Sequence, residues 1–565
     1  MLDEVQSHTD LDNWEIVHKD EVPKGTDILP AVWAMRRKRR ITTQEPYKWK
    51  ARLNVHGGKQ EHGVNYWETY SPVVSWTTIR MYLTLSILNK WCTRQVDFVL
   101  AFPQADIECP MYMEIPRGFK FEGSRRTHCL SLKKNLYGQK QAGRVWNEYL
   151  HDGLVARGFK QSEVDLCLYH RKNVALLLYV DDGIFVGPNQ QDIDEAFNIL
   201  VVPFDDHPAF KMTDEGTLGD YLGVKIDYLD NGTIKLSQPH LIQQILDDLG
   251  FNERTGTKAT PAAVAVKLNR DLHGTPIDEK WHYRSVIGKL NFLEKSTRLD
   301  IAYAVHQCAR FSNDPKASHA AAIKRLGKYL LGTKDKGLIL NPKDHSFDCF
   351  CDADFCGNWD RVNADVDPST AKSRSGYIIT YASCPIVWAS KLQPYVALST
   401  SEAEYGSLST SLRDVIQMMQ IVEEARNRLD WKTFEGKPTV HCKAFEDNVG
   451  TLEWARLPKM RTRTKHLNIR MHHFREHVRN KLISIHKIPT RYQLGDIATK
   501  PQPEDLFVSQ RESLMQWESE FMTKEELNLP AHHMRACDIT DQAESLCGGN
   551  HHEDAVRTEN GALDL

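Results

Sequence analysis

The sequence lacks the features that would place it in a membrane or secreted class. No apolar run approaches the ~20 residues that a membrane-spanning helix needs. Residues 1–20 are polar and acidic, so they do not read as a secretory signal peptide. Without such a signal, the twelve cysteines are better explained as reduced thiols than as a disulfide framework. We therefore expect no membrane partner.

The sequence also has little excess of either charge. Its formal net charge is −3 over 565 residues, whereas a protein that acts on nucleic acid is usually more basic. The Lys and Arg residues are nevertheless clustered, at residues 36–40, at 48–52 and over 459–481. Local clusters rather than the total charge determine the attraction to phosphates. For any one cluster, a solvated charged surface is the alternative.

The length and the apolar patterning indicate several domains. A chain of 565 residues is too long for one hydrophobic core, and about 150 residues per domain predicts three or four units. We expect an α+β or α/β multidomain fold, with no internal repeat. The predicted segments are a disordered leader (1–28), a domain of alternating strands and helices (29–250), a linker and helices (251–340), a second α/β domain (341–505) and a polar acidic tail (506–565).

Two adjacent aspartates, Asp181 and Asp182, lie between apolar runs rich in β-forming residues. This pattern predicts a hairpin with acids at its tip, although Asp-Asp-Gly also suits a plain turn. Two charges this close repel each other by several kcal/mol unless a cation lies between them. A third acid, Asp97, ends another strand-like run. Three such carboxylates could hold two Mg²⁺ ions about 3.5–4 Å apart, a site suited to phosphoryl transfer.

These acids belong to a series of motifs that resembles the Pol polyproteins of copia-type LTR retrotransposons. Tyr179-Val180-Asp181-Asp182 is similar to the Tyr-x-Asp-Asp motif of reverse transcriptases. The other motifs are Trp49-Lys50-Ala51-Arg52-Leu53, Tyr70-Ser71-Pro72-Val73-Val74, Leu136-Tyr137-Gly138-Gln139-Lys140-Gln141-Ala142, Tyr221-Leu222-Gly223-Val224, Tyr283-Arg284-Ser285-Val286-Ile287-Gly288 and Thr297-Arg298-Leu299-Asp300-Ile301. The ordered series is far more specific than one motif. It implies a right-hand polymerase with fingers, palm and thumb, followed by a mixed-sheet RNase H-like domain.

The resemblance also implies roles for individual residues of the first domain. Lys50 and Arg52 are similar to fingers residues that grip the incoming triphosphate, and Gln141 to a glutamine that touches the incoming nucleotide. Phe102 falls where reverse transcriptases keep an aromatic residue beneath the sugar. A core aromatic is the alternative for Phe102. The implied polymerase metal ligands are Asp97, Asp181 and Asp182.

A second set of acids lies in the C-terminal half of the chain. Residues 347–353, 375–381 and 386–390 are predicted to be strands, and residues 399–417 a helix. The acids resemble the Asp-Glu-Asp-Asp set of RNase H, another two-metal site, which activates water against an RNA phosphodiester. They are Asp352, Glu404, Asp447 and Asp496.

Alternatives remain for these acids and for their neighbours. Four unrelated surface acids are the alternative for the set as a whole. Glu402 competes with Glu404 but is explained as a charge in the first turn of the helix, and Asp354 ranks after Asp352. A basic segment resembles one of the family that holds backbone phosphates, with a solvated loop as the alternative. Its residues include Arg463, Lys465 and His466.

The remaining Cys and His residues are not expected to form a metal site. Those at the C-terminal end have a spacing that fits no ordinary zinc finger, so we do not expect a zinc site there. They are His532, His533, Cys537, Cys547, His551 and His552. Three cysteines near the first strand of the second domain are expected to be core thiols. They are Cys349, Cys351 and Cys356.

The resemblance implies RNA- and DNA-templated DNA synthesis together with RNase H cleavage, for retrotransposon replication. The implied cofactor is Mg²⁺, two ions per active site, with Mn²⁺ as a substitute. The implied partners are an RNA template, a DNA primer, RNA–DNA hybrid, dNTPs, and integrase or other polyprotein products. The implied location is a cytoplasmic virus-like particle, with nuclear entry of the complex.

Two other functions stay open at this point. One is a binding or structural relic in which the fold persists without catalysis, and the other is an unrelated two-metal nuclease. The sequence contains no aspartic-protease Asp-Thr/Ser-Gly triad, no His-His-Cys-Cys zinc module and no integrase acid triad. We therefore interpret it as a processed product, a truncated gene model or a decayed copy.

Overall fold

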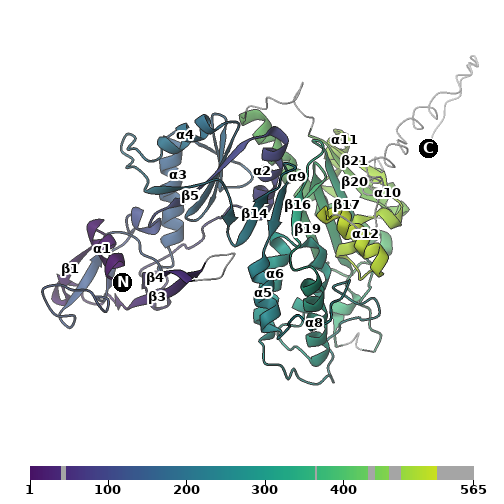
Figure 1. Cartoon of the computed structure of the whole chain (residues 1–565), viewed down its shortest axis with the longest axis horizontal. Helices are drawn as coiled ribbons and strands as arrows, with labels where there is room; N and C mark the ends of the chain where they lie inside the picture. The colour runs from purple at the N-terminus through teal and green to yellow at the C-terminus, as the bar shows by residue number, and fades with distance from the viewer. Residues whose placement is uncertain (40–45, 363–365, 430–439, 457–471, 518–565) are drawn as a thin grey trace, which may run out of the picture. The chain divides into compact units, whose positions relative to one another are not determined.

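Five β-sheets and the helices that cover them make up the described part of the chain. The computed structural model describes residues 1–39, 46–362, 366–429, 440–456 and 472–517 (Figure 1). Residues 1–517 belong to one unit. No helix among the described residues is long and apolar enough to cross a membrane.

The N-terminal residues form a folded element, so the predicted disordered leader over residues 1–28 is wrong. Helix α1 (Leu2–Asp10) precedes a four-stranded sheet in the order β1 (Trp14–His18), β7 (His128–Leu132), β6 (Tyr112–Met113) and β2 (Ile28–Leu29). Val5 and Trp14 are buried in one core with Leu130 and Leu132. Two apolar side chains in a polar segment are too few to reveal a helical or strand periodicity in the sequence. Strand β7 supplies other residues of this core.

A two-stranded ribbon follows. Strands β3 (Ala31–Arg39) and β4 (Pro46–Val55) pair antiparallel, with Ala31 opposite Val55 at one end and Arg37 opposite Trp49 near the other. Leu53 and Val55 are buried in the N-terminal core. The core therefore holds one end of the ribbon.

A six-stranded sheet carries the first set of predicted acids. Its order is β12 (Met212–Gly216), β5 (Cys92–Phe98), β11 (Asp182–Gly187), β10 (Val174–Tyr179), β9 (Leu168–Arg171) and β8 (Lys160–Gln161). Helices α2 (Trp76–Asn89), α3 (Ala142–Ala156) and α4 (Gln190–Asn198) contact this sheet. Helix α2 begins where the Ser75 side chain accepts a hydrogen bond of 3.1 Å from Thr78 N, a normal N-terminal cap.

A four-stranded sheet and a group of helices follow. The sheet order is β13 (Asp220–Tyr221), β14 (Val224–Tyr228), β15 (Ile234–Ser237) and β16 (Leu338–Leu340). The predicted helices after residue 281 are present, and helix α5 contacts both α6 and α8. The helices are α5 (Pro239–Asp248), α6 (Tyr283–Ser296), α7 (Ala302–Ala309) and α8 (Ala317–Gly332).

The C-terminal sheet has five strands, and the three predicted strands are confirmed. The order is β19 (Cys384–Leu392), β18 (Arg374–Tyr381), β17 (Phe347–Asp354), β20 (Cys442–Glu446) and β21 (Ile483–Lys487). β17, β18 and β19 pair antiparallel, whereas β20 and β21 run parallel to β17. This is the mixed sheet expected for an RNase H-like domain. Helix α9 (Thr400–Arg428) contacts β17 and β18.

Helix α9 is longer than predicted because its apolar face continues. The sequence predicts an end at residue 417, but Met418, Met419, Ile421 and Val422 are buried and extend the helix to Arg428. Burial against neighbouring elements outweighs the weak periodicity of this polar stretch. Two short helices follow, α10 (Val449–Arg456) and α11 (Arg475–Arg479).

The predicted tail over residues 506–565 begins too early. Helix α12 (Glu504–Met515) and Trp517 belong to the folded unit, and Phe507, Leu514 and Trp517 are buried. The Trp517 indole donates a hydrogen bond of 2.6 Å to Gly337 O. Because these few apolar residues lie among polar ones, the sequence pattern did not predict the helix. Residues 518–565 lie outside the described residues.

Candidate metal centres

The tip of the β10–β11 hairpin presents the first pair of acids. Val180 and Asp181 form the turn, and Asp182 is the first residue of β11. Val180 has a left-handed backbone (φ 58°), which is unusual for a β-branched residue and costs about 1–3 kcal/mol. Two hydrogen bonds hold this tip in place. The Trp146 indole donates to Val180 O (2.7 Å), and Phe98 N donates to Asp181 O (2.7 Å).

The Asp-Asp-Gly pattern suggested that Gly183 is part of the turn, but the structure places it outside the turn. It lies within β11, opposite Leu178 on one side and Val96 on the other. A Cβ atom at this position would lie 2.8 Å from Val96 Cγ2. Glycine is therefore needed here for close packing between strands, whereas the turn itself is made by Val180 and Asp181.

Asp97 and Asp182 are brought together by the pairing of β5 with β11. The two residues are directly opposite in the antiparallel register, so their side chains leave the same face of the sheet. Like charges in directly opposed positions are destabilising, and Asp181 adds a third carboxylate at the adjacent turn. Both neighbours of Asp97, Val96 and Phe98, are buried on the other face. The donor set of three carboxylates fits a hard divalent cation.

These three aspartates are less tightly gathered than the second set of acids. Among the described residues, they do not form a group whose ligand atoms all lie within 4.8 Å of one another. All three side chains are half-buried. The paired strands therefore fix the backbone positions of Asp97 and Asp182.

Two of the residues predicted to bind substrate, Arg52 and Phe102, lie beside Tyr137. The Arg52 guanidinium lies 4.6 Å from the centre of the Tyr137 ring, and the Phe102 ring lies 5.2 Å from it. Burial raises the pKa of Tyr137 to about 12, with further contributions from Asp181 and Asp97 that Arg52 partly offsets. Arg52 and Phe102 therefore share one aromatic neighbour, Tyr137, whose hydroxyl lies within electrostatic reach of both aspartates.

Lys50 and Gln141 occupy different surroundings. Lys50 is half-buried in β4, opposite Arg36. Gln141 precedes helix α3 and is 1% exposed. Its side-chain oxygen accepts a hydrogen bond of 2.9 Å from Gln60 Nε2, while its own nitrogen has no hydrogen-bond partner. In this conformation Gln141 does not reach the surface, and contact with a nucleotide remains a prediction.

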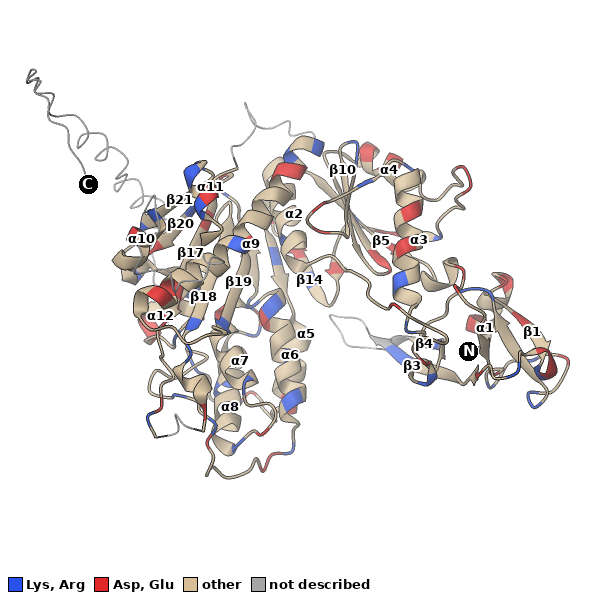
Figure 2. Ribbon diagram, turned by 180° about the vertical axis from the view of Figure 1, so that it is seen from behind, with Lys and Arg blue, Asp and Glu red and all other residues tan. Residues whose placement is uncertain are grey.

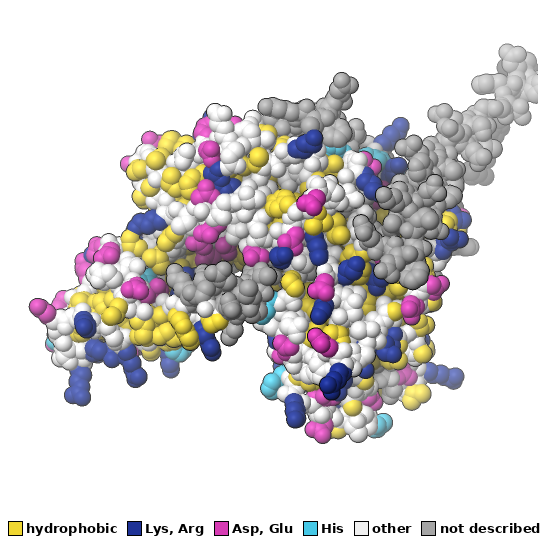
Figure 3. Space-filling model, in the orientation of Figure 1, with side chains coloured by type: hydrophobic (Ala, Val, Ile, Leu, Met, Phe, Trp, Pro, Cys, Tyr) yellow, Lys and Arg dark blue, Asp and Glu magenta, His cyan; other side chains and the backbone are white. Residues whose placement is uncertain are grey.

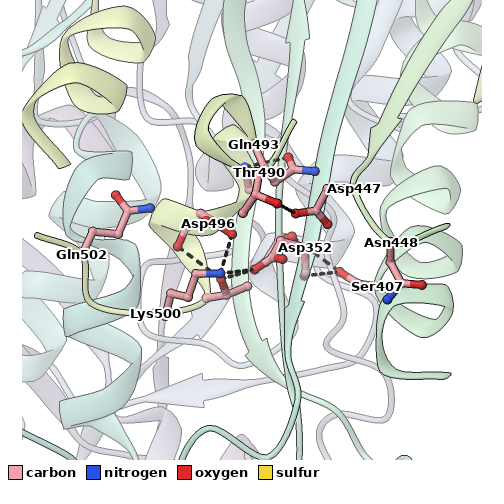
Figure 4. Close-up of polar contacts among 12 residues, drawn as sticks. Asp352, Ser407, Asp447, Asn448, Thr490, Gln493, Asp496, Lys500 and Gln502 are labelled. Atoms are coloured by element: carbon pink, nitrogen blue, oxygen red, sulfur yellow. Dashed lines mark hydrogen bonds and ion pairs between the residues drawn. The ribbon is translucent and has the colours of Figure 1, made fainter. Parts of the chain in front are cut away.

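The second set of acids forms a compact group. One ligand atom from each of Asp352, Glu404 and Asp447 lies within 4.8 Å of the others. Asp352 and Glu404 are almost completely buried, and Asp447 is half-buried. Figure 4 shows Asp352 and Asp447 beside the hydroxyl of Thr490, which donates a hydrogen bond of 2.7 Å to Asp447.

The topology of the five-stranded sheet explains why residues so far apart in sequence meet. Strands β17 and β20 are parallel, and Phe350 is opposite Phe445 at the end of their paired region. Asp352 and Asp447 each follow two positions later, so they emerge at the same edge. Glu404 lies in the second turn of α9, and Ser407 on that helix donates a hydrogen bond of 2.8 Å to Asp352 O.

Asp496 joins this group through Lys500. The Lys500 ammonium lies 2.8 Å from Asp496 Oδ1 and 3.8 Å from Asp352 Oδ2, as Figure 4 shows. The Thr499 hydroxyl donates a short hydrogen bond to Asp352. Gly495 permits this close approach, because a Cβ there would lie 3.0 Å from Asp352 N. The short helix η9 (Leu494–Ala498) therefore brings the fourth acid to the edge of β17.

The group contains more buried carboxyl groups than basic partners. Burial raises the pKa of Glu404 well above its usual value, and Asp352, Glu446 and Asp447 raise it further. Burial and Asp352 also raise the pKa of Asp496 to about 8, although Lys500 opposes this. Glu404 is 4% exposed, and its Oε2 atom has no hydrogen-bond partner. A buried carboxylate oxygen without a partner is costly unless a cation is present, so the donor set fits a divalent cation.

Sequence reasoning chose between competing acids but missed two charged neighbours. The Glu402 carboxylate has a different partner. It accepts a hydrogen bond of 2.9 Å from Leu398 N at the start of α9. Asp354 is outside the group of three acids. Glu446 is fully buried beside the group and was not singled out, nor was Lys500. The four-residue spacing of Lys500 from Asp496 is the signal that could have revealed the ion pair.

Some predictions fall on residues that the structure does not describe. Arg463, Lys465 and His466 lie outside the described residues, as do the Cys and His residues after position 517. Among the described cysteines, Cys349 and Cys351 are buried thiols, and Cys356 is half-buried. The interpretation of Cys349 and Cys351 as core residues is confirmed.

Residues 11–264 match the family described as reverse transcriptase (RNA-dependent DNA polymerase). The chain is 32% identical over 519 residues to the retrovirus-related Pol polyprotein from transposon TNT 1-94 of Nicotiana tabacum. It is 30% identical over 514 residues to that from transposon RE1 of Arabidopsis thaliana. These alignments each cover 90% of this chain but only 37% and 33% of the relatives. The chain thus spans about a third of their length.

Solved structures show a more distant similarity. A foamy viral protease-reverse transcriptase in complex with double-stranded DNA aligns with 86% of this chain and 69% of its own, at 11% identity and a TM-score of 0.42.

Proposed function

Because the chain belongs to the copia-type retrotransposon Pol polyproteins, and its residues 11–264 match a reverse transcriptase, we propose that it copies RNA and DNA templates into DNA. We further propose that its C-terminal domain cleaves the RNA strand of RNA–DNA hybrids. The substrates would be dNTPs and a DNA primer paired to a template. The two activities together would serve retrotransposon replication. The observation that carries the polymerase proposal is the pairing of Asp97 with Asp182 inside the matched segment.

The first centre has the chemistry that nucleotidyl transfer requires. Asp97, Asp181 and Asp182 would hold Mg²⁺, with Mn²⁺ as a substitute. Lys50 and Arg52 would offset the charge of the triphosphate, and Phe102 would support the sugar. The rigid hairpin tip would fix the acids relative to the primer end, and a fixed geometry contributes strongly to phosphoryl transfer.

The second centre has the chemistry that metal-assisted hydrolysis requires. Asp352, Glu404, Asp447 and Asp496 would be its ligands. The hydroxyl groups of Thr490 and Thr499 orient Asp447 and Asp352, as outer hydrogen bonds commonly do for metal ligands. Lys500 offsets part of the negative charge before a cation binds.

Bound divalent cations would supply the same help at both centres, lowering the pKa of the attacking hydroxyl or water and neutralising charge on the leaving group. The buried Glu404 oxygen, which has no hydrogen-bond partner, supports the assignment of a cation to the second centre. The alternative is a binding relic, which would keep both folds and bind nucleic acid without turnover.

Two assays on the purified full chain test the proposal. One is extension of a DNA primer on RNA and on DNA templates, and the other is cleavage of a labelled RNA–DNA hybrid, each with Mg²⁺ and with EDTA. We expect both activities with Mg²⁺ and neither with EDTA. A folded protein that binds primer–template but shows no turnover with Mg²⁺ or Mn²⁺ would instead be the binding relic.

A further inference from the structure

A cavity lies between two helices and the irregular segment that precedes α6. Helices α7 and α8 form one side of it, and residues 261–268, which contain no helix or strand, form the other. The two helices contact each other, and Figure 2 shows them in the lower part of the molecule. The volume of the cavity is about 220 Å³. A cavity of about 150 Å³ already holds a benzene ring, so this one has room for a small organic molecule.

Hydrogen bonds at both ends hold the segment across the helices. Arg325 on α8 donates a hydrogen bond of 2.7 Å to Thr260 Oγ1, and His319 Nε2 on the same helix donates one of 2.8 Å to Asn269 O. The walls between these two anchors are lined mainly by small side chains, namely Ala262, Ala263, Ala304, Ala321 and Ala322. The space remains unfilled because the segment is anchored at each end and the side chains between are short.

The walls are apolar apart from one cation. Arg325 is the only charged residue among the described residues that line the cavity. Burial raises the pKa of the Cys308 thiol in the same wall to about 12, so this group stays neutral. Figure 3 shows charged side chains of both signs on the outside of this region, where α5, α6 and α8 lie. The interior of the cavity therefore differs from the surface around it.

Arg325 has no anionic partner among the described residues. Its guanidinium donates to the neutral Thr260 hydroxyl, and its buried Nε atom has no hydrogen-bond partner. A partly buried cation is costly unless an anion is close to it. Arginine binds carboxylates with two parallel hydrogen bonds. The cavity therefore fits a small molecule that has an apolar body and a carboxylate group.

One wall of the cavity borders the second metal centre. Pro261, Ala262 and Tyr303 line the cavity and also line a smaller space of about 10 Å³. Lys500, which lies 2.8 Å from Asp496 Oδ1, lines that smaller space too. A molecule that pushes this wall outward therefore presses on Lys500, and through it on the acids. An ammonium group pressed against these acids competes with a divalent cation for them.

Gln307 provides a second connection to the same centre. It lines the cavity and is 3% exposed. Its side-chain oxygen accepts a hydrogen bond of 3.0 Å from Arg374 Nη2. Arg374 is opposite Asp354 in the register of β17 with β18, two positions after Asp352. Both connections lead to the second centre, and the described residues that line the cavity include none of the acids of the first centre.

We propose that this cavity is a regulatory site for a small apolar carboxylate, which weakens cation binding at the second centre and slows hybrid cleavage while primer extension continues. The effect on cleavage rests on the proposed function of the second centre, whereas binding of the molecule does not.

Calorimetric titration of the full chain with naphthoate and with its neutral amide, naphthamide, tests the binding. The two probes share their rings, but only the acid can form an ion pair with Arg325. We expect the acid to bind about tenfold more tightly or better, and Arg325→Gln to remove this preference while still donating to Thr260. Lys324→Gln is the matched control, because Lys324 is the adjacent residue and pairs with Glu279; it should keep the preference.

The Ala321→Phe variant tests the location of the site. Ala321 is exposed and lines the cavity, so a phenyl ring there should fill the entrance and abolish binding of both probes without disturbing the fold. Binding of naphthoate that survives Ala321→Phe overturns the location. Equal affinities of the wild type for acid and amide, or a preference that survives Arg325→Gln, overturn the assignment of the carboxylate to Arg325.

Hybrid cleavage and primer extension with and without saturating naphthoate test the regulation. At limiting Mg²⁺ we expect cleavage by the wild type to fall about fivefold or more, cleavage by Ala321→Phe to stay unchanged, and extension to stay unchanged in both. Because coupling between two sites is reciprocal, Mg²⁺ should weaken naphthoate binding by the same factor. Cleavage and naphthoate affinity that ignore the other ligand overturn the regulatory role. Failure of the proposed function looks different, because cleavage is then absent without naphthoate while the effect of Mg²⁺ on naphthoate binding persists.

Discussion

The buried acids of the C-terminal domain predict an unusual dependence of stability on pH. Asp496 has a pKa of about 8 in the folded protein, against an ordinary value of 3.8. Between these values the folded state holds a proton that the unfolded chain has released. The free energy of unfolding therefore falls as the pH rises, by up to about 1.4 kcal/mol per pH unit for one proton. Between pH 5 and pH 7 the loss is up to about 3 kcal/mol.

The Asp496→Asn variant isolates this effect from other titrating groups. Asp348 has a raised pKa of about 6 and His170 a lowered one of about 3, both mainly through burial, and their contributions cancel when variant and wild type are compared at one pH. In EDTA we expect the two stabilities to be closest near pH 4 and the advantage of the variant to grow as the pH rises. Between pH 5 and pH 7 this advantage should grow by about 1 M in the urea midpoint, if m is about 2–3 kcal/mol/M.

Mg²⁺ should remove the difference. An ion at a hundred times its Kd stabilises the folded state by about 2.7 kcal/mol, so the wild type should regain stability at pH 7 and lose its pH dependence. Urea unfolding followed by tryptophan fluorescence measures each state. A stability difference between variant and wild type that is the same at pH 5 and pH 7, or that ignores Mg²⁺, would refute the reasoning about buried charge.

Three further outcomes follow from the described residues. Phe102→Val should open space below the sugar and raise ribonucleotide incorporation relative to deoxyribonucleotide by about tenfold or more; an unchanged ratio in single-nucleotide incorporation by an active variant would identify Phe102 as a core residue. Ending the chain after Trp517 should leave both activities within a few-fold, whereas ending it after Ser509 removes Leu514 and Trp517, whose burial is worth about 2–3 kcal/mol each, and should abolish hybrid cleavage with loss of folding by circular dichroism. The affinity for primer–template should fall steeply with salt, with a slope of about −0.9 in log–log form for each phosphate contacted, and a flat titration would contradict binding through the basic clusters.

The sequence predicted the long, strongly patterned elements best. The apolar runs around Asp181 and Asp182 became β10 and β11, and the start of α9 was visible in Ser399 and Glu402. Elements with few apolar residues were missed. Helix α1 and strand β1 each bury a single apolar side chain, Val5 and Trp14, and α12 spaces its buried residues among charged ones. Such segments fold because a distant strand or helix completes their core, which no local window contains.

The candidate sites divide in the same way. The acids themselves were predictable because each lies at the end of a strand or in a helix turn with a recognisable motif. Their environment was not. The Glu446 carboxyl and the Lys500 ammonium are placed by the parallel pairing of β20 with β17 and by the close approach of η9. The register of β3 with β4 is likewise not set by the sequence alone.

The central claim is that two separate carboxylate centres perform two separate reactions, and paired substitutions test it most directly. Primer extension and hybrid cleavage would be measured on Asp181→Asn, on Glu404→Gln and on the matched control Glu402→Gln. We predict that Asp181→Asn abolishes extension and keeps cleavage, that Glu404→Gln does the reverse, and that Glu402→Gln keeps both. Loss of both activities from a single folded variant, or cleavage that survives Glu404→Gln and is lost in Glu402→Gln, would contradict the account.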